Sequence, residues 1–295
     1  MNAVWSFWSK PFFAHHQHAW LSDRHHWLAW VLSLETAKRH YPTTTLVTDR
    51  LGFELLVKQL GLTFTVVSTE LEQLRDADPH WWVLGKLWAY RIQKEPFVHL
   101  DNDVFLWSRL PDWMESADVL GQSPEWFPPN DQSWYRPGAF SEAIRAVGGW
   151  APDEWWSSVS QHLDQAICCG IVGGRATDFL SSYADVAIRM IQHPRNSLAW
   201  SRLGNIIGDN ILIEQYLLAA CLWYRRQRAG SPFNVGYLFP STEAAFDEYA
   251  AAAVGYTHLI GDAKKNVALM DRLALRVQRD FPGYYERCIG RSGLE

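Results

Sequence analysis

The chain has 295 residues, of which 48% are hydrophobic and 20% charged, and its 27 Lys and Arg against 32 Asp and Glu give a formal net charge of −5. A chain of this length can bury a large core. The slightly acidic balance argues against nucleic acid as a partner, because binding along a phosphate backbone needs a basic face. No window reaches about 18 apolar residues without a charge, and the first residues do not resemble a signal peptide. We therefore expect no transmembrane segment and a cytoplasmic location.

Strands and helices alternate over the first hundred residues. Strands are expected at 3–9, 43–48, 64–67 and 96–100, and helices at 20–39, 51–60 and 84–93. This alternation predicts an α/β fold in which helices cover both faces of a mostly parallel central sheet. Ligands of such sheets bind at the carboxyl ends of the strands.

The middle of the chain is less regular. Residues 123–140 are rich in proline and aromatic side chains, and we expect them to form a surface loop over a site. Further strands are expected at 167–172, 234–239 and 255–259, and further helices at 177–192, 210–228 and 263–280. Since no repeat or charge block divides the sequence, a single domain is predicted.

The segment PFVHLDNDVFLW at 96–107 gives the sharpest chemical signal. An apolar strand delivers Asp101, Asn102 and Asp103 at its carboxyl end, and a second apolar run follows at once. Two carboxylates with one residue between them, on non-helical backbone, can share a hard divalent cation such as Mg²⁺ or Mn²⁺. Such a cation would hold a diphosphate. Solvated turn residues are the alternative, because Asp and Asn favour turns, but the position directly after a strand favours a site.

A second motif, GYTHLIGDAKKN at 255–266, contains the spacing HxxGxxK, and its His258 lies 155 residues after Asp103. The sequence predicts that His258 ends a strand, that Gly261 permits close backbone approach, and that Lys264 lies in the first turn of the next helix. The free N–H groups of a helix start favour phosphate. A histidine before a glycine turn is often structural, but together with the DxD sequence it favours a metal-bound diphosphate.

These two motifs resemble those of the GT-A nucleotide-sugar glycosyltransferases of the glycogenin type, which are retaining enzymes of family 8. The resemblance covers most of the chain in order and approximate spacing. It implies a Rossmann-like GT-A fold in which Asp101, Asp103 and His258 bind Mn²⁺ or Mg²⁺. It also implies that Gly261 and Lys264 contact the diphosphate of the donor.

The resemblance further implies a metal-dependent transfer of a sugar from a nucleoside-diphosphate sugar, with a UDP-sugar as the expected donor. The acceptor, whether a saccharide, a protein or a small molecule, is not identified, and retention is the expected outcome. Residues 1–107 would form the nucleotide-binding half, 108–254 the acceptor half, and 255–295 the second motif and a final helix. Residues 126–134 would close over the donor and exclude water.

Candidates for the catalytic group are less sharply defined. Lys86 matches a basic residue that the family places before the DxD strand, facing the donor, and an ordinary lysine on a helix surface is the alternative. The family's Asp-Gln pair near the reacting sugar carbon corresponds to Glu214 and Gln215, or else to Asp209 and the asparagine after it. The apolar run that follows favours the first pair. The mid-chain segment 168–170, which ends in glycine, departs from the family pattern. The catalytic group and the stereochemical outcome of the transfer therefore stay open.

Residues of the first strands are candidates for contact with the nucleotide. Trp8 can stack on a base, Asp49 can bind ribose or base, and Asn102 belongs with the donor contacts. The alternatives are sheet core for Trp8 and a helix N-cap for Asp49. Five histidines crowd the region after the first strand, at His15, His16, His18, His25 and His26. Adjacent histidines do not easily face one metal, so no metal site is expected there.

Two other functions fit parts of the pattern. A sugar- or nucleotide-binding protein of the same fold would keep the site and lack turnover. A phosphatase with a nucleophilic DxD aspartate is a second rival, but such enzymes resemble DxDx followed by Thr or Val near the N-terminus. Here Phe105 occupies that place, and about a hundred residues come first.

Overall fold

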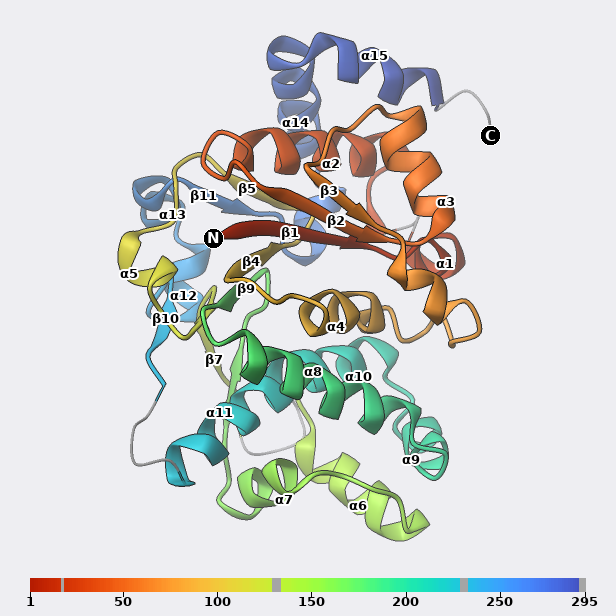
Figure 1. Ribbon diagram of the computed structural model, residues 1–295, viewed down its shortest axis with the longest axis vertical. Coiled ribbons are helices and arrows are strands. Elements are labelled where there is room, and N and C mark those ends of the chain that lie inside the picture. The colour runs from red at the N-terminus through yellow and green to blue at the C-terminus, as the bar shows by residue number, and fades with distance from the viewer. Residues whose placement is uncertain (17–18, 129–133, 229–232, 292–295) are drawn as a thin grey trace. The chain divides into compact units, whose positions relative to one another are not determined.

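The computed structural model describes residues 1–16, 19–128, 134–228 and 233–291, without the side chains of residues 15, 16, 206 and 291. Its strands are β1 (Asn2–Phe7), β2 (Thr44–Thr48), β3 (Val66–Ser68), β4 (Phe97–Leu100), β5 (Val104–Leu106), β6 (Val119–Gly121), β7 (Pro124–Trp126), β8 (Gln165–Ile167), β9 (Ile171–Gly174), β10 (Val235–Tyr237) and β11 (Tyr256–His258). A seven-stranded, mixed and mostly parallel sheet has the order β10-β6-β9-β4-β1-β2-β3 and is flanked by helices (Figure 1). The predicted fold class is confirmed. Two further pairs are β11-β5 and β7-β8.

The residues of the chain contact one another mainly within two compact units. The first unit comprises residues 1–80, 99–110 and 249–295, and the second comprises residues 81–98 and 111–248. The functional division at residues 107 and 254 stays a prediction. Among the helices of the described residues, none is both long enough and apolar enough to cross a membrane.

The first unit is built on a parallel ladder. β1 pairs with β2 from Ala3↔Thr44 to Phe7↔Thr48, and β2 continues the ladder to β3. Its helical elements are α1 (Ser9–Pro11), η1 (Phe12–His16), α2 (Asp23–Ala37), α3 (Arg50–Phe53), η3 (Glu54–Gln59), η4 (Glu70–Leu74), η6 (Gly261–Lys265), α14 (Val267–Asp280) and α15 (Pro282–Arg291). α13 (Glu248–Val254) comes where the chain returns to this unit.

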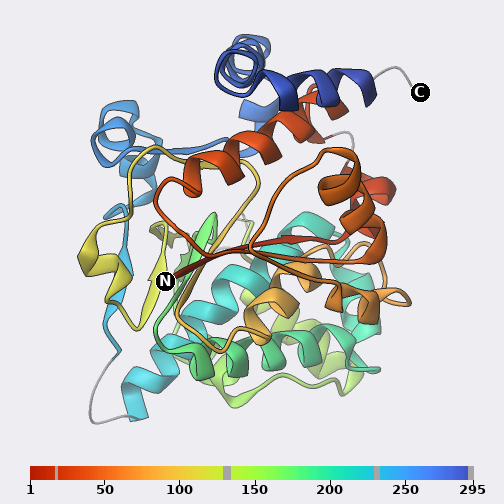
Figure 2. The ribbon, with the colours of Figure 1, turned by 45° about the horizontal axis from the view of Figure 1, so that its top comes forward.

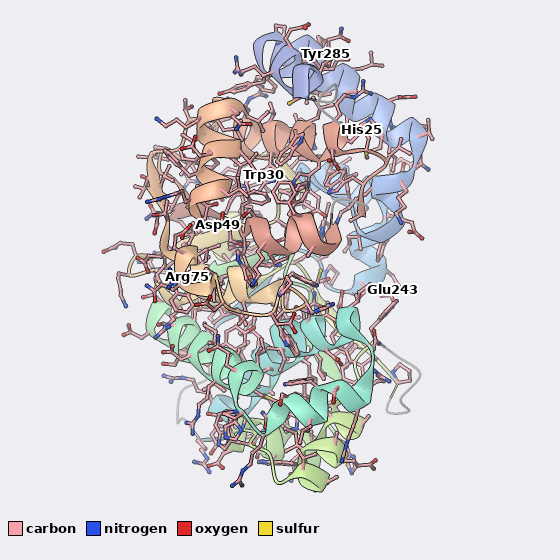
Figure 3. All side chains as sticks on the ribbon, turned by 90° about the vertical axis from the view of Figure 1, so that its right-hand side faces the viewer. His25, Trp30, Asp49, Arg75, Glu243 and Tyr285 are labelled. Carbon is pink, nitrogen blue, oxygen red and sulfur yellow. The ribbon has the colours of Figure 1, made fainter. Side chains whose placement is uncertain are left out.

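Helix α2 is the central helix of the first unit. It packs against β5, α14 and α15, and the dark blue α15 lies next to it in Figure 2. Because neighbours cover several of its sides, α2 is buried over most of its surface instead of along one stripe. Its Trp30 is only 1% exposed, and His25 is buried as well (Figure 3).

The second unit combines a short mixed ladder with packed helices. β6 is parallel to β10 and antiparallel to β9. Its helical elements are α4 (Val83–Arg91), α5 (Asp112–Glu115), α6 (Pro137–Val147), α7 (Asp153–Ser160), α8 (Thr177–Gln192), α9 (Asn196–Leu203), α10 (Ile206–Ile211), η5 (Leu212–Tyr216), α11 (Leu217–Arg228) and α12 (Thr242–Phe246). The pairs α4 with α8, α6 with α9 and α7 with α11 pack together.

Two predictions for the second unit are wrong. The strand expected at 167–172 is two strands, because β8 pairs with β7 while β9 pairs with β6, so the chain changes sheets between them. Residues 123–140, expected to be a loop, begin with β7 and end inside α6, and residues 129–133 lie outside the described part. Proline was no obstacle there, since Pro124 begins a short strand and Pro137 begins a helix, positions where its missing N–H is tolerated.

Candidate metal centre

A tight turn after β4 presents the DxD sequence. All four residues of β4 are buried, and the chain turns at once into the buried strand β5. The N–H of Val104 donates to the carbonyl of Asp101 at 3.0 Å and closes the turn. The hydroxyl of Ser33 on α2 donates to the same carbonyl at 3.2 Å. The turn is therefore fixed to the central helix of the first unit.

Strand pairing brings the second motif to this turn. β11 is antiparallel to β5 with His258 opposite Val104, and the N–H of Leu259 donates to the carbonyl of Asp103 at 3.0 Å. As a result, His258 Nε2 lies 3.5 Å from Asp103 Oδ1. Asp101, Asp103 and His258 each offer one ligand atom, and these atoms lie within 4.8 Å of one another. The side chain of Asp103 is 5% exposed and that of Asp101 26%.

This group could bind a metal ion. Bonds of about 2.1 Å to an octahedral cation such as Mg²⁺ place neighbouring ligand atoms ~3 Å apart and opposite ones ~4.2 Å apart. The observed separations are close to this range. Carboxylate oxygens are ligands of hard divalent cations, and imidazole is a common ligand of transition metals. The partial exposure of Asp101 leaves a side from which further ligands can approach.

Lys264 lies beside the carboxylate of Asp103, and Gly261 begins the 3₁₀ turn that carries Lys264. Lys264 Nζ is 2.5 Å from Asp103 Oδ2. Gly261 has a φ of 56°, in the left-handed region, and a Cβ added there would meet no atom within 4 Å. The predicted position of Lys264 is wrong in detail, since it lies in the 3₁₀ turn η6 and α14 starts later, where the side chain of Asn266 accepts from Leu269 N at 3.1 Å. That cap forms because an asparagine precedes the apolar stripe of the helix.

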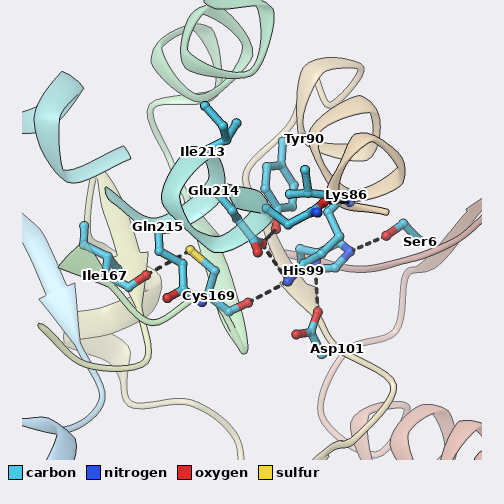
Figure 4. A network of polar contacts seen from close by, with 12 residues as sticks. Ser6, Lys86, Tyr90, His99, Asp101, Ile167, Cys169, Ile213, Glu214 and Gln215 are labelled. Carbon is cyan, nitrogen blue, oxygen red and sulfur yellow. Dashed lines mark hydrogen bonds and ion pairs between the residues drawn. The ribbon is translucent and has the colours of Figure 1, made fainter. Parts of the chain in front are cut away.

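His99 is a member of the site that the sequence interpretation missed. Its ring is 1% exposed, and its Nδ1 lies 3.8 Å from Asp101 Oδ1. Its Nε2 lies 3.0 Å from the hydroxyl of Ser6 on β1 (Figure 4). The signal available in the sequence was a polar residue in the otherwise apolar run PFVHL, two positions before Asp101.

Within the histidine-rich region, the two described side chains, His25 and His26, have different partners. His26 stacks on Phe12 at 4.5 Å, accepts from Trp30 Nε1 at 3.2 Å and places its Nδ1 3.4 Å from the amide nitrogen of Asn102. His25 Nδ1 lies 2.8 Å from the hydroxyl of Ser22. His18 and the side chains of His15 and His16 lie outside the described part. His26 is thus a core residue that contacts the DxD turn through Asn102.

Trp8 and Asp49 lie in the interior of the first unit. Trp8 is 6% exposed. Asp49 Oδ1 accepts from Gly52 N at 2.7 Å and caps α3, while Oδ2 accepts from the N–H and hydroxyl of Ser9 at 3.0 and 2.6 Å. Asp49 is therefore an N-cap that also fixes the end of β1, and a contact of either residue with a nucleotide stays a prediction.

The second unit brings together Lys86 and Glu214. Lys86 Nζ lies 2.6 Å from Glu214 Oε1 and donates to the carbonyl of Cys169 at 3.3 Å, and the hydroxyl of Tyr90 donates to the same Oε1 at 2.8 Å (Figure 4). The side chains of Lys86 and Glu214 are 11% and 1% exposed. Lys86 is therefore no ordinary surface lysine but half of a buried ion pair. Glu214 lies in the π-helical turn η5, a form frequent at functional sites.

Gln215 and Asp209 also lie in the second unit, and each has other neighbours than Lys86 and Glu214 have. The hydroxyl of Tyr135 contacts both the carboxyl of Glu125 and the amide oxygen of Gln215. Burial raises the pKa of Glu125. Burial also raises the pKa of Asp209 to about 7, although the nearby Arg136 opposes the shift. Neither Tyr135 nor Glu125 was a candidate from the sequence, and both lie within residues 123–140, where a loop was expected.

Comparison with known proteins adds one assignment. No match to this sequence was found among curated proteins. A protein-family model covers residues 1–290, which include both motifs and nearly the whole of the two units. The chain therefore belongs to a family of unknown function, DUF6734.

Proposed function

We propose that this protein is a metal-dependent glycosyltransferase that takes a sugar from a nucleoside-diphosphate sugar, with UDP as the expected nucleotide. The observation that supports this most is the meeting of Asp101, Asp103 and His258, which come from segments far apart in the chain. Lys264 adds an ammonium group beside them. A divalent cation held by two carboxylates, next to an ammonium group, is suited to a diphosphate.

Asp101, Asp103 and His258 would hold Mn²⁺ or Mg²⁺, which when bound supplies positive charge that stabilises the departing diphosphate. Lys264 would donate to the diphosphate oxygens and stabilise the same charge, which grows as the bond to the anomeric carbon breaks. Gly261 would let a phosphate oxygen approach the backbone, because no side chain occupies the space above its Cα.

Transfer with retention needs no strong base from the protein. The departing phosphate oxygen can accept the proton of the acceptor hydroxyl while the new glycosidic bond forms on the same face of the sugar. From the resemblance, we propose that Gln215 steadies the positively charged sugar. Glu214 suits a supporting role better, since its carboxylate is buried and already bound by Lys86 and Tyr90. Asp209 is a further candidate for a proton-carrying group, because its pKa is about 7.

A panel of nucleotide sugars tests the proposal. Binding and slow hydrolysis of each donor are measured with and without Mn²⁺, for the wild type, for Asp103→Asn and for Asp262→Asn as a control. Asp262 is exposed and lies in the same 3₁₀ turn as Lys264. We expect one donor to be bound and hydrolysed only with Mn²⁺, Asp103→Asn to abolish both, and the control to behave as the wild type.

The same panel separates the rival functions. A binding protein without turnover would bind a nucleotide with Mn²⁺ and hydrolyse no donor, even with acceptors present. A phosphatase would release phosphate from p-nitrophenyl phosphate and ignore the sugar. An Asp103→Asn variant that keeps wild-type affinity and metal dependence would contradict the proposed metal site.

A further inference from the structure

The carboxylate of Asp103 is already engaged by a cation of the protein itself. Lys264 Nζ lies 2.5 Å from Oδ2, an ion-pair distance, while Oδ1 faces His258 Nε2 at 3.5 Å. The carboxylate is 5% exposed and Lys264 23%, so the pair is largely shielded from water. A metal ion that binds Asp103 must therefore share this carboxylate with an ammonium group.

Charge makes such sharing unfavourable. A divalent cation and an ammonium group on opposite oxygens of one carboxylate lie only a few ångströms apart, and repulsion between like charges at ~4 Å is strong where water is scarce. Two carboxylates carry two negative charges, whereas a divalent cation and Lys264 carry three positive ones. The group therefore has a surplus positive charge, which an anionic ligand removes.

The side chain of Lys264 can move while its backbone stays in place. Its carbonyl accepts from Leu21 N at 3.0 Å, which ties the backbone to the segment before α2. The long side chain is flexible, and its ammonium lies 5.6 Å from the centre of the Trp20 ring, a second attractive position. Gly261, in the same 3₁₀ turn, leaves open space beside its backbone.

We propose that Lys264 is an internal counter-ion of Asp103 that a diphosphate draws away, so that cation and diphosphate bind cooperatively. This inference rests on the proposed function. With no diphosphate present, Lys264 competes with the cation for Asp103. When a diphosphate binds, Lys264 pairs with a phosphate oxygen, Asp103 becomes available, and each ligand raises the affinity of the other by the same factor.

Mn²⁺ titrations of Lys264→Met test whether Lys264 exchanges between Asp103 and a diphosphate. Binding is followed by calorimetry with Mn²⁺ alone, and then with UDP, pyrophosphate or uridine present, with free Mn²⁺ corrected for its complexes with phosphates. The wild type should bind Mn²⁺ at least about 5-fold more tightly when UDP or pyrophosphate is present, which is the lower end of typical coupling between sites, and uridine should have no effect. Lys264→Met should bind Mn²⁺ alone about 10-fold more tightly than the wild type and show weaker coupling, because only the contact between cation and diphosphate then remains.

Two matched variants keep the experiment interpretable. Lys265→Met removes the neighbouring exposed lysine and should behave as the wild type. Lys264→Arg keeps the positive charge and should restrain Mn²⁺ binding as the wild type does. Thermal melting of each variant shows whether it is folded, and Lys264→Gln replaces Lys264→Met if that variant is not.

The outcomes distinguish this inference from the proposed function. Suppose that Mn²⁺ binds to the wild type and that Lys264→Met has the same Mn²⁺ affinity and the same coupling to the diphosphate. Lys264 then does not exchange between Asp103 and the diphosphate, while the proposed metal centre stands. If Lys264→Met binds Mn²⁺ more weakly, Lys264 helps to build the site and the exchange is again wrong. If neither protein binds Mn²⁺ at millimolar concentration, the exchange and the proposed function both fail.

Discussion

His99 Nδ1 lies 3.8 Å from Asp101 Oδ1, on a ring that is almost fully buried and that reaches Ser6 with its other nitrogen. A residue that contacts a metal ligand without binding the metal itself orients that ligand and stabilises its charge. Replacing them typically costs 10–100-fold in metal affinity. We therefore expect His99→Gln to weaken Mn²⁺ binding by about 10-fold, measured by calorimetry.

Ser6→Ala provides the graded comparison for that prediction. It leaves the imidazole in place and removes only the hydroxyl 3.0 Å from it, so its effect on Mn²⁺ affinity should be smaller than that of His99→Gln. Equal Mn²⁺ affinities for the wild type and His99→Gln would show that His99 does not position Asp101.

The Lys86–Glu214 pair gives a prediction about stability. Lys86→Met leaves the carboxylate of Glu214, 1% exposed, without its ammonium partner. Removing one member of a buried pair typically costs about 3–5 kcal/mol, whereas replacing both by uncharged groups costs much less. Urea unfolding should show a large loss for Lys86→Met and a partial recovery for Lys86→Met with Glu214→Gln. A single variant as stable as the wild type would contradict the buried ion pair.

Asp209 gives a prediction about pH. Burial raises its pKa in the folded protein from the ordinary value of 3.8 to about 7. The folded state therefore holds a proton that the unfolded state releases, and the stability from this group is present at low pH and lost as the pH rises through 7. The free energy of unfolding should fall between about pH 4 and 7, with a slope of at most ~1.4 kcal/mol per pH unit from this group. Urea unfolding at several pH values should show that the free energy of unfolding depends less on pH in Asp209→Asn than in the wild type. The same pH dependence in both proteins would show that the pKa of Asp209 is not raised.

Gly261 permits a test in which stability and binding are separated. Gly261→Ala places an L-residue at a φ of 56°, which typically costs about 1–2 kcal/mol although the space is open. Gly204 has a φ of 63° and equally open space, so Gly204→Ala is a matched control. Both variants should lose similar stability on thermal unfolding, but only Gly261→Ala should weaken binding of UDP with Mn²⁺. Equal UDP affinities in the two variants would exclude a phosphate beside Gly261.

Periodicity predicted much of the fold. The helix expected at 177–192 is α8 with the same bounds, and the apolar runs around β1, β2 and β4 are strands. The break between β8 and β9 was not predictable, because Cys168, Cys169 and Gly170 are as apolar as their neighbours and the break depends on which strands each side pairs with. Periodicity reports which residues are buried but does not say against which partner.

The same limit applies to the candidate sites. The types and spacing of Asp101, Asp103 and His258 suggested a shared cation, and these side chains do lie together. The ion pair of Lys264 with Asp103 depends on the antiparallel register of β5 and β11, which no local pattern encodes. Likewise, the partners Lys86 and Glu214 are separated by 128 residues, and each had to be judged alone in the sequence.

The most direct test of the metal centre is a crystal structure of the protein soaked with Mn²⁺ and UDP, with data collected at the manganese absorption edge. We expect one anomalous peak within bonding distance of Asp101, Asp103 and His258, with Lys264 moved from Asp103 to the diphosphate. An ion bound elsewhere, or Lys264 still paired with Asp103 while the diphosphate is bound, would contradict it.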